Sequence, residues 1–336
     1  MGVTFILTFV FNPNFILRIK VLYFIDIFVI IVLSCARDNF KFFEMLFAQN
    51  DNSFYKKKST LNLNGNLISL SSPVVMGILN VTPDSFYDGG IYTSESAIVN
   101  RASNILEEGG QLIDIGAMST RPGAIEISLG EELERLLPAA IAVKREFPQA
   151  FLSIDTYRSE VVKAVYHEIG DFIVNDISGG TFDASIFKTV ADLHLPYILM
   201  HTKGKSNSMQ TSPVYEDVVK EIILFFATQV QKLKLLGVCD IIIDPGFGFG
   251  KTPAHNYELI NRLDSFKTFE LPVLVGTSRK AMIWKELGIT PNESLNGTTV
   301  LNTLALSGGC DILRVHDVKE AVEAVKLVGN IKSIAK

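Results

Sequence analysis

The chain has 336 residues, of which 48% are hydrophobic and 20% are charged, and its net charge is −5 at pH 7. This length exceeds that of an average domain, but a closed (β/α)₈ barrel alone needs roughly 250 residues, so one large domain with an appendage accounts for it. A mildly acidic chain lacks the basic field that phosphate backbones attract, which argues against a nucleic-acid partner.

The cysteines indicate a reducing compartment. Cys35, Cys239 and Cys310 are odd in number and lie at no metal-binding or redox spacing. We therefore expect reduced thiols in a cytoplasmic protein, with Cys239 and Cys310 serving as small buried hydrophobic residues.

Residues 1–44 differ in composition from the remainder. They are rich in aromatic and aliphatic side chains, but the Asn-Pro-Asn at 12–14 interrupts the first apolar run, Arg18 and Lys20 separate the two halves, and Asp26 lies in the second. A membrane span needs about 20 consecutive apolar residues, and a signal peptide carries its positive charge ahead of the apolar region. Neither pattern fits, so membrane association is not expected.

Three interpretations of residues 1–44 stay open: a weak membrane anchor, a structured extension, and translation of sequence upstream of the true start. We favour the third, which makes Met45 the biological start and predicts disorder or poor packing before about residue 55. Residues 45–72 are then a lead-in, and residues 73–336 form the main domain.

Residues 60–70 predict a β-hairpin. Two alternating runs flank Asn64 and Gly65, and an Asn-Gly pair in that position is the strongest short-range hairpin signal. Because the hairpin immediately precedes the first predicted barrel strand, we expect it to close the amino-terminal end of the barrel.

From Pro73 onward, strand-like runs alternate with helix-like runs. The apolar runs begin near residues 74, 112, 152, 172, 196, 241, 272 and 312. Helical spacing of apolar residues marks segments 94–109, 130–147, 158–170 and 215–237. Gly109, Gly170 and Gly237 end three of these helices where a left-handed cap belongs. Eight such units, without a glycine-rich dinucleotide turn after the first strand, favour an α/β fold of the closed (β/α)₈ TIM-barrel type over an open doubly wound sheet.

Nearly every apolar run ends in a polar residue that can take part in chemistry. These residues are Asn80, Asp114, Asp155, Asn175, Asp176, His201, Asp244, Ser278 and His316. The carboxyl ends of barrel strands meet at one end of the barrel, so the pattern predicts a shared active site there.

The glycine-rich segment 244–252 resembles two nucleotide-binding loops but matches neither. A P-loop requires glycine where Pro245 stands, and the dinucleotide fingerprint requires glycine where Lys251 stands. We expect instead a tight turn after a strand, whose glycines allow unusual backbone angles while Phe247 and Phe249 offer ring faces to a flat ligand.

Sorting the strand ends by neighbouring strand predicts a pocket with two halves. Asp155, Asn175 and Asp244 form a half rich in acceptors, which suits the aminopyrimidine edge of a planar heterocycle. A cationic half contains Lys280, Arg314 and His316; it suits a phosphorylated group, since the last two strands of such barrels commonly bind phosphate. Asn80 lies beside this second half and suits a Mg²⁺ ion that bridges a diphosphate.

Each assignment has a structural alternative. Asp155 could cap the following helix, Lys280 could be a surface lysine at a helix start, and His316 could be a satisfied structural histidine. We expect His167, His194 and His255 at the surface, while the role of His201 stays open.

The strand ends and their loops resemble the dihydropteroate synthase family. The motifs occur in the family's order: GILNVTPDSFYDGG, IDIGAMSTRPGA, SIDT, VNDISGG, LMH, DPGFGFGK, GTSRK and RVHDV. They cover the chain from about Val74 to about Val318, and only the amino-terminal extension has no counterpart. The resemblance implies a TIM barrel, usually a homodimer, that joins 6-hydroxymethyl-7,8-dihydropterin diphosphate to p-aminobenzoate and releases diphosphate with Mg²⁺.

The resemblance also implies roles for individual residues. Pterin binding falls to Asp155, Asn175, Asp244 and Lys280, with Met200 and Phe249 packing on the ring. Asn80, Arg314 and His316 match the diphosphate and metal positions. Thr120, Arg121 and Pro122, with Ser278 and Phe249, match the p-aminobenzoate side, and Arg121 is also expected to reach the diphosphate. Asp114 receives no role.

The implied reaction is a dissociative substitution. Diphosphate leaves first, and the neutral amine then attacks a cationic pterin methylene, with Asp155, Asp244, Lys280, Arg314 and His316 as the catalytic set. Two other functions are alternatives: a methyltetrahydrofolate-binding methyltransferase domain, and a noncatalytic pterin-binding protein tethered by the apolar extension.

Overall fold

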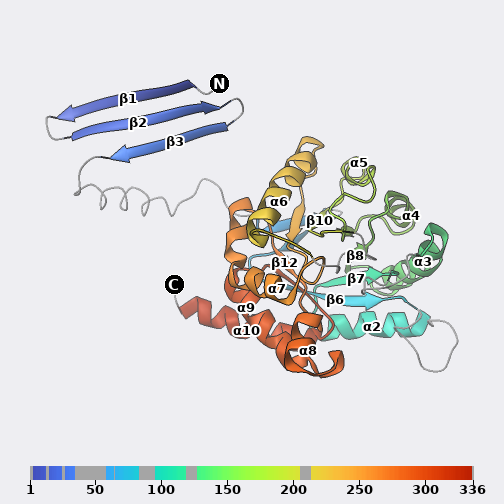
Figure 1. The fold of residues 1–336 in the computed structure, drawn as a ribbon. Coiled ribbons are helices and arrows are strands. Elements are labelled where there is room, and N and C mark those ends of the chain that lie inside the picture. Colours follow the sequence, from blue (N-terminus) through green and yellow to red (C-terminus); the bar gives the residue numbers. More distant parts are fainter. Residues whose placement is uncertain are drawn as a thin grey trace. The chain divides into compact units, whose positions relative to one another are not determined.

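The chain divides into two compact units, residues 1–56 and residues 57–336. The computed structural model describes residues 3–12, 15–24, 27–34, 58–63, 65–82, 95–118, 127–204 and 213–334. In the first unit, strands β1 (Val3–Asn12), β2 (Phe15–Phe24) and β3 (Ile27–Ser34) form an antiparallel sheet in the order β1-β2-β3 (Figure 1). The three interpretations of residues 1–44 stay predictions.

The second unit is a barrel of parallel strands. The strands are β6 (Val74–Asn80), β7 (Leu112–Gly116), β8 (Phe151–Asp155), β9 (Ile173–Asp176), β10 (Tyr197–Met200), β11 (Ile241–Asp244), β12 (Leu274–Val275) and β13 (Ile312–Val315). They follow chain order around the sheet, and β13 pairs with β6. A parallel bridge between Ile243 and Val273 links β11 to the segment entering β12 and closes the ring. The predicted TIM barrel is confirmed.

Helices connect consecutive strands and surround the barrel (Figure 1). They are α2 (Glu95–Glu107), α3 (Leu129–Glu146), α4 (Ser159–Ile169), α5 (Ile186–Asp192), α6 (Val218–Leu235), α7 (Pro253–Asn261), α8 (Ala281–Leu287), α9 (Leu295–Gly308) and α10 (Val318–Ile334), with 3₁₀ turns η3 (Leu263–Phe269) and η4 (Pro291–Glu293). The four predicted helical segments match α2, α3, α4 and α6. Gly109, Gly170 and Gly237 have φ of 94°, 75° and 88°, which glycine adopts most easily, but ψ of −145° places Gly170 outside the left-handed helical conformation expected of such a cap.

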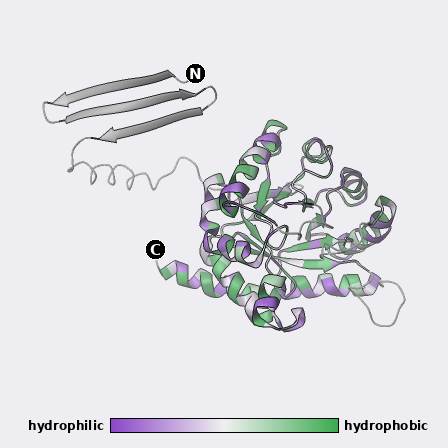
Figure 2. Cartoon of the chain, viewed as in Figure 1, coloured by the Kyte–Doolittle hydropathy of each residue, from purple (hydrophilic) through white to green (hydrophobic). Residues whose placement is uncertain are grey.

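Two apolar layers hold the barrel together. The larger lies between the strands and the helices, and it buries residues at helical spacing, such as Ile98, Ala102 and Ile105 on α2. Figure 2 shows the consequence: the barrel strands are largely hydrophobic, whereas the helices carry hydrophilic residues as well.

The second layer fills the amino-terminal end of the barrel. Strands β4 (Thr60–Leu63) and β5 (Asn66–Ser69) form an antiparallel hairpin. Its Leu61 and Ile68 are buried in one cluster with residues from the barrel strands, namely Val74, Met76, Leu112, Ile173, Ile198, Ile242, Leu274 and Ile312. The predicted hairpin therefore closes this end of the barrel, although Asn64 of its turn lies outside the described residues.

The cysteine prediction is half right. Cys310 is buried with a free thiol, but Cys239 is exposed, because it follows the end of α6 at the surface. Cys35 lies outside the described residues. Among the helices of the described segments, none combines the length and the apolar character needed to span a bilayer.

Close packing of β6 against α2 makes Gly77 a sensitive position. A Cβ atom there would lie 2.5 Å from Cγ2 of Ile105, whose side chain is fully buried. We expect Gly77→Ala to destabilise the fold by about 1–3 kcal/mol, as over-packing of a dense core usually does. Gly130, in the first turn of α3, has open space around its Cα, so Gly130→Ala should be neutral or stabilising by up to about 1 kcal/mol. Urea unfolding of both variants checks this, and equal effects would contradict it.

Candidate active site

The site is a second interior layer that lies directly above the apolar cluster at the amino-terminal end. Side chains of a strand point to the same face every second residue. The buried residues Leu112, Ile173, Ile198, Ile242 and Ile312 belong to the lower cluster. Two residues further along the same strands come Asp114, Asn175, Met200, Asp244 and Arg314. The alternation of strand residues therefore places polar chemistry on top of an apolar plug.

Arg314 joins two carboxylates across the barrel interior. From β13, its Nε atom lies 2.6 Å from Oδ2 of Asp114 on β7, and its Nη2 atom lies 2.8 Å from Oδ2 of Asp155 on β8. The two predicted halves of the pocket are thus not separate, because the cation expected on the diphosphate side pairs with a carboxylate of the acceptor side. That part of the prediction needs correction.

Asp114 is the centre of this network. Only 1% of the residue is exposed, and it also accepts hydrogen bonds from Oγ of Ser153 at 2.6 Å and from Nδ2 of Asn175 at 3.2 Å. Residues on three other strands, β8, β9 and β13, thereby contact this one carboxylate of β7. Sequence reasoning assigned Asp114 no role, although its offset of two residues from Leu112 was a usable signal.

Asp155 is a buried acceptor with an altered titration. Burial raises its pKa from 3.8 to about 7, an effect that Arg314 opposes and Asp114 reinforces. Asp155 does not cap the next helix: Arg158 occupies the N-cap position of α4 without a side-chain cap, and the Ser159 N–H donates to Asp183 at 2.7 Å. The capping alternative is wrong.

Asp244 ends β11 and begins the glycine-rich turn. Its Oδ1 atom accepts the Gly246 N–H at 2.7 Å, and burial raises its pKa while the charge of Lys280 lowers it. Gly246 has φ of 72°, and a Cβ atom there would lie 1.9 Å from the His201 carbonyl oxygen. Both the backbone angle and the close approach require glycine, as the sequence predicted.

The two phenylalanines of this turn have different surroundings. Phe249 is half-buried and packs with Met200, Tyr157 and Ile177 in a small apolar cluster at the site. Phe247 is only 1% exposed and belongs to the main core. The expectation that both rings face a ligand is therefore wrong for Phe247.

Lys280 closes the acceptor side of the pocket. Its ammonium donates to the Phe247 carbonyl and lies 4.6 Å from the centroid of the Phe249 ring. Burial lowers its pKa to about 8, against the opposing charge of Asp244. Lys280 precedes α8 but is half-buried among these groups, so it is not the surface lysine of the alternative interpretation.

A second buried lysine, Lys251, was missed by sequence reasoning. Its Nζ atom lies 3.0 Å from Nδ1 of His201 and donates to the carbonyls of Gly246 and Phe249, each at 2.9 Å. Burial and the charge of Lys251 lower the pKa of His201 to about 2, so this imidazole is neutral and accepts from the lysine. His201 therefore helps to hold the glycine-rich turn. Lys251 had served only to exclude a dinucleotide fingerprint.

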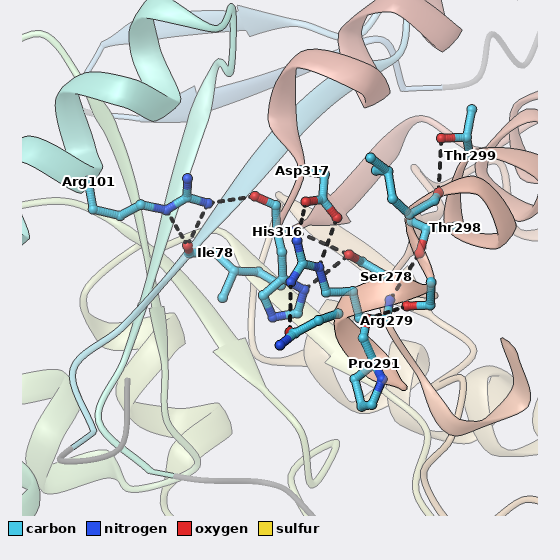
Figure 3. A network of polar contacts seen from close by, with 12 residues as sticks. Ile78, Arg101, Ser278, Arg279, Pro291, Thr298, Thr299, His316 and Asp317 are labelled. Atoms are coloured by element: carbon cyan, nitrogen blue, oxygen red, sulfur yellow. Dashed lines mark hydrogen bonds and ion pairs between the residues drawn. The ribbon is translucent and has the colours of Figure 1, made fainter. Parts of the chain in front are cut away.

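The loops after β12 and β13 are tied together by a polar network (Figure 3). Nδ1 of His316 lies 3.0 Å from Oγ of Ser278, and Nε of Arg279 donates to Asp317 at 3.1 Å. Arg101 of α2 donates to the carbonyls of His316, at 2.7 Å, and Ile78, at 3.3 Å, which brings the ends of β13 and β6 into one assembly.

His316 is not cationic in this state. Burial and the charge of Arg314 lower its pKa to about 4, so the imidazole is neutral at pH 7. The sequence prediction of a cationic half that includes His316 needs this correction. Its contact with Ser278 does place the predicted diphosphate and p-aminobenzoate positions side by side.

Asn80 stands at the carboxyl end of β6, half-buried. Within the described part of the chain, no group of three or more His, Cys, Asp or Glu side chains could hold a metal ion. Thr120, Arg121 and Pro122 lie outside the described residues.

The remaining polar strand-end residue, Asp176, has a structural role. Asp176 is fully buried and accepts from the Tyr197 hydroxyl and from the Ser178 and Gly180 N–H groups.

His167 and His194 are exposed, as predicted. His255 is half-buried instead, because it forms a capping box with Thr252 at the start of α7.

Comparison with known proteins matches this arrangement. A profile of the family described as pterin binding enzymes matches residues 76–316. The dihydropteroate synthase of Escherichia coli (strain K12) is 42% identical over 266 residues, which cover 79% of this chain and 93% of that protein.

Solved structures agree. A Yersinia pestis dihydropteroate synthase in complex with a sulfonamide drug has a TM-score of 0.77 at 40% identity, covering 82% of this chain and 99% of that one. A Xanthomonas albilineans dihydropteroate synthase with 4-aminobenzoic acid has a TM-score of 0.76 at 36% identity, covering 82% and 98%. Because these matches span the barrel and nearly the whole of each relative, the chain belongs to the pterin-binding enzymes and, among them, to the dihydropteroate synthase family.

Proposed function

We propose that this protein condenses 6-hydroxymethyl-7,8-dihydropterin diphosphate with p-aminobenzoate to give 7,8-dihydropteroate and diphosphate. The observation that carries the proposal is the ring of buried acceptors formed by Asp155, Asn175 and Asp244 beside the apolar cluster of Met200 and Phe249. Relatives named as synthases favour this activity over a methyltransferase domain or a noncatalytic pterin-binding protein.

The acceptor side binds the pterin. Asp244 can accept two parallel N–H bonds from an aminopyrimidine edge, which a carboxylate does with particular strength. Met200 and Phe249 contact the flat faces of the ring, while the Lys280 ammonium supplies a donor for a pterin carbonyl or ring nitrogen. An apolar environment strengthens each of these polar contacts, because little water competes for them.

The opposite side binds the diphosphate. Arg314 and His316 donate to phosphate oxygens, and an arriving phosphate raises the proton affinity of the neutral imidazole. Asn80 fits a Mg²⁺ ion, since its amide oxygen is a hard donor and such ions are usually held by one or two protein oxygens together with substrate phosphates and water. When bound, the metal offsets the charge that develops on the departing diphosphate.

The reaction needs stabilisation of charge more than a strong base. The amine of p-aminobenzoate is neutral at pH 7, so it attacks without prior deprotonation. Arg314 stabilises the leaving diphosphate, and Asp155 and Asp244 face a pterin ring whose positive character rises. The p-aminobenzoate is oriented by Thr120, Arg121, Pro122 and Ser278. Holding two substrates in the reacting geometry can lower the activation barrier by several kcal/mol, roughly 7–11 at best.

We also propose that two copies of the chain associate, in the cytoplasm. Helices α9 and α10 pack together, and each exposes apolar residues one turn apart: Val300 and Leu304 on α9, Leu327 and Ile331 on α10, with exposed fractions of 49–68%. Apolar faces of this kind favour burial in an isologous dimer.

Residues 73–336 would form the pterin-binding domain, residues 45–72 its lead-in, and residues 1–44 an extension outside it.

Asp244→Asn tests the pterin assignment. An amide offers one acceptor where the carboxylate offers two, and hydrogen bonds to charged groups are worth about 1.5–3 kcal/mol, so the Kd for 6-hydroxymethylpterin should rise roughly 10- to 150-fold. Calorimetric titration measures this, alongside an assay of dihydropteroate formation. Asp264, an exposed carboxylate on η3, provides the control variant Asp264→Asn. Near wild-type diphosphate release by Asp244→Asn would show that the role is wrong.

Pterin affinity should peak between pH 7 and pH 8. Asp155 accepts with both oxygens only as a carboxylate, and its pKa is about 7, so affinity rises as the pH passes this value. Above a pKa of about 8, Lys280 loses its charge and affinity falls. Binding titrations from pH 5.5 to 9 check the profile. The lower limb should vanish in Asp155→Asn.

The contribution of Asp155 to folding stability should fall as the pH rises, whereas its contribution to pterin affinity should rise. Because the pKa of Asp155 is raised on folding, its contribution to stability is fully present below 3.8 and is lost as the pH rises through about 7. Denaturation at several pH values should therefore show Asp155→Asn gaining stability, relative to wild type, as the pH rises. A difference independent of pH would contradict the raised pKa.

Leu304→Glu combined with Leu327→Glu should abolish association. Two charges placed in an apolar interface oppose its burial, so light scattering should give the mass of one chain where wild type gives two. Leu67→Glu, at a residue 68% exposed on the hairpin, is the control and should leave the mass unchanged. A wild-type protein that is monomeric at micromolar concentrations would refute the dimer.

A further inference from the structure

Asp114 is a buried charged residue for which the proposed reaction has no use. Both of its oxygens are occupied: Oδ1 accepts from Ser153 and Asn175, and Oδ2 accepts from Arg314 and Asn175. Its side chain is fully buried within the site layer. An ionised carboxylate is costly to bury, and two of the three partners of Asp114 are residues that the proposed function places against the substrate.

The first of these partners is the Asn175 amide. A carboxylate only accepts hydrogen bonds, so the Asn175 group that faces it, at 3.2 Å from both oxygens, must be the NH₂ group. The amide oxygen is consequently turned away from Asp114. No described residue donates to that oxygen, which leaves it as an acceptor for a ligand.

The second partner is the Arg314 guanidinium. Asp114 holds Nε at 2.6 Å, and this contact leaves Nη2 to pair with Asp155. A planar fork held at two points cannot rotate about its long axis. Within the described residues nothing accepts from Nη1, so its two donors are available for a ligand oxygen.

We propose that Asp114 is a positioning residue that sets the ligand specificity of the pocket by forcing Asn175 to present its oxygen and by fixing the guanidinium plane of Arg314. Through these two contacts, one carboxylate outside the substrate's reach orients an acceptor for the heterocycle and a donor for the phosphate. The inference rests on the proposed function and deepens it.

Asp114→Asn tests this with little change of shape. The neutral amide can donate as well as accept, so Asn175 is free to reverse and Arg314 loses its charged partner. We expect the Kd for 6-hydroxymethylpterin to rise at least tenfold and kcat to fall, while the KM for p-aminobenzoate changes less than threefold. Ser153→Ala is the matched control, because it removes a hydrogen bond on Asp114 that involves neither Asn175 nor Arg314. A wild-type Kd in a folded Asp114→Asn variant, or equal losses for both substrates, would overturn the proposal.

The pH profile separates positioning from simple structural support. Asp155 faces Arg314, Asp114, Glu132 and Asp176. Replacing Asp114 removes one negative neighbour of Asp155 and leaves Arg314 paired with Asp155 alone. The pKa of Asp155 should therefore fall, and the midpoint of pterin binding near pH 7 should move to lower pH. An unchanged midpoint would refute the coupling.

A double-variant cycle tests the link to Asn175. If Asp114 acts through that amide, Asn175→Ala and Asp114→Asn should together cost clearly less affinity than the sum of their separate losses. Fully additive losses would contradict the link.

One measurement requires no variant, and so stands even if Asp114→Asn does not fold. In labelled wild-type protein, the side-chain NH₂ of Asn175 should stay protected from hydrogen exchange both before and after pterin binding. Loss of protection on binding would show that the amide reverses, against the proposal. Failure of the proposed function looks different, since wild type itself would then neither bind pterin nor form dihydropteroate.

Discussion

The pairing of Arg314 with Asp114 and Asp155 is the interaction on which the rest of the site depends. Two carboxylates and one guanidinium lie inside a barrel, where each charge costs several kcal/mol to desolvate and is tolerable only when it is paired and hydrogen-bonded. Ser153 and Asn175 supply the further hydrogen bonds that Asp114 needs. Because the partners come from four strands, the network also fixes the relative heights of those strands at their carboxyl ends.

The pairing leaves a surplus of negative charge that a ligand can use. Arg314 is shared between two carboxylates, and burial still raises the pKa of Asp155 to about 7. Asp244 and Lys280 also carry opposite charges, and each shifts the pKa of the other in the direction that favours its charged form. Burial brings the pKa of Asp155 to about 7 and that of Lys280 to about 8. Two groups that titrate so close to neutral pH suit a site that binds a donor-rich heterocycle with an anionic leaving group.

Backbone geometry supports these side chains from below and from the side. The hairpin of β4 and β5 and the lower ends of the strands form a dry plug under the charged layer. The glycine-rich turn is held by Lys251, whose ammonium contacts two carbonyls of that turn. Held in this position, the turn directs the Phe247 carbonyl toward Lys280 and the Phe249 ring toward the pocket.

Much of the fold followed from local patterns. Predicted strand starts agree with the observed ones to within two residues, the hairpin of β4 and β5 occurs as expected, and the glycines after α2, α4 and α6 have positive φ. These features depend on short-range physics: period-two and helical spacing of apolar residues, and backbone angles that only glycine adopts easily. The same patterns identified Asp155, Asn175 and Asp244 as strand-end residues and placed Lys280 after the seventh strand.

Contacts across the barrel, in contrast, were decided only by the tertiary structure. No local pattern states that Arg314 reaches Asp114, because 200 positions separate them and the side-chain direction depends on barrel closure. The neutrality of His316 and the burial of Phe247 likewise arise from neighbours brought close by folding. The sequence by itself determined which residues stand at the strand ends. Only the tertiary structure decided which of them share a proton, a charge or a hydrogen bond, since those energies depend on distance and desolvation.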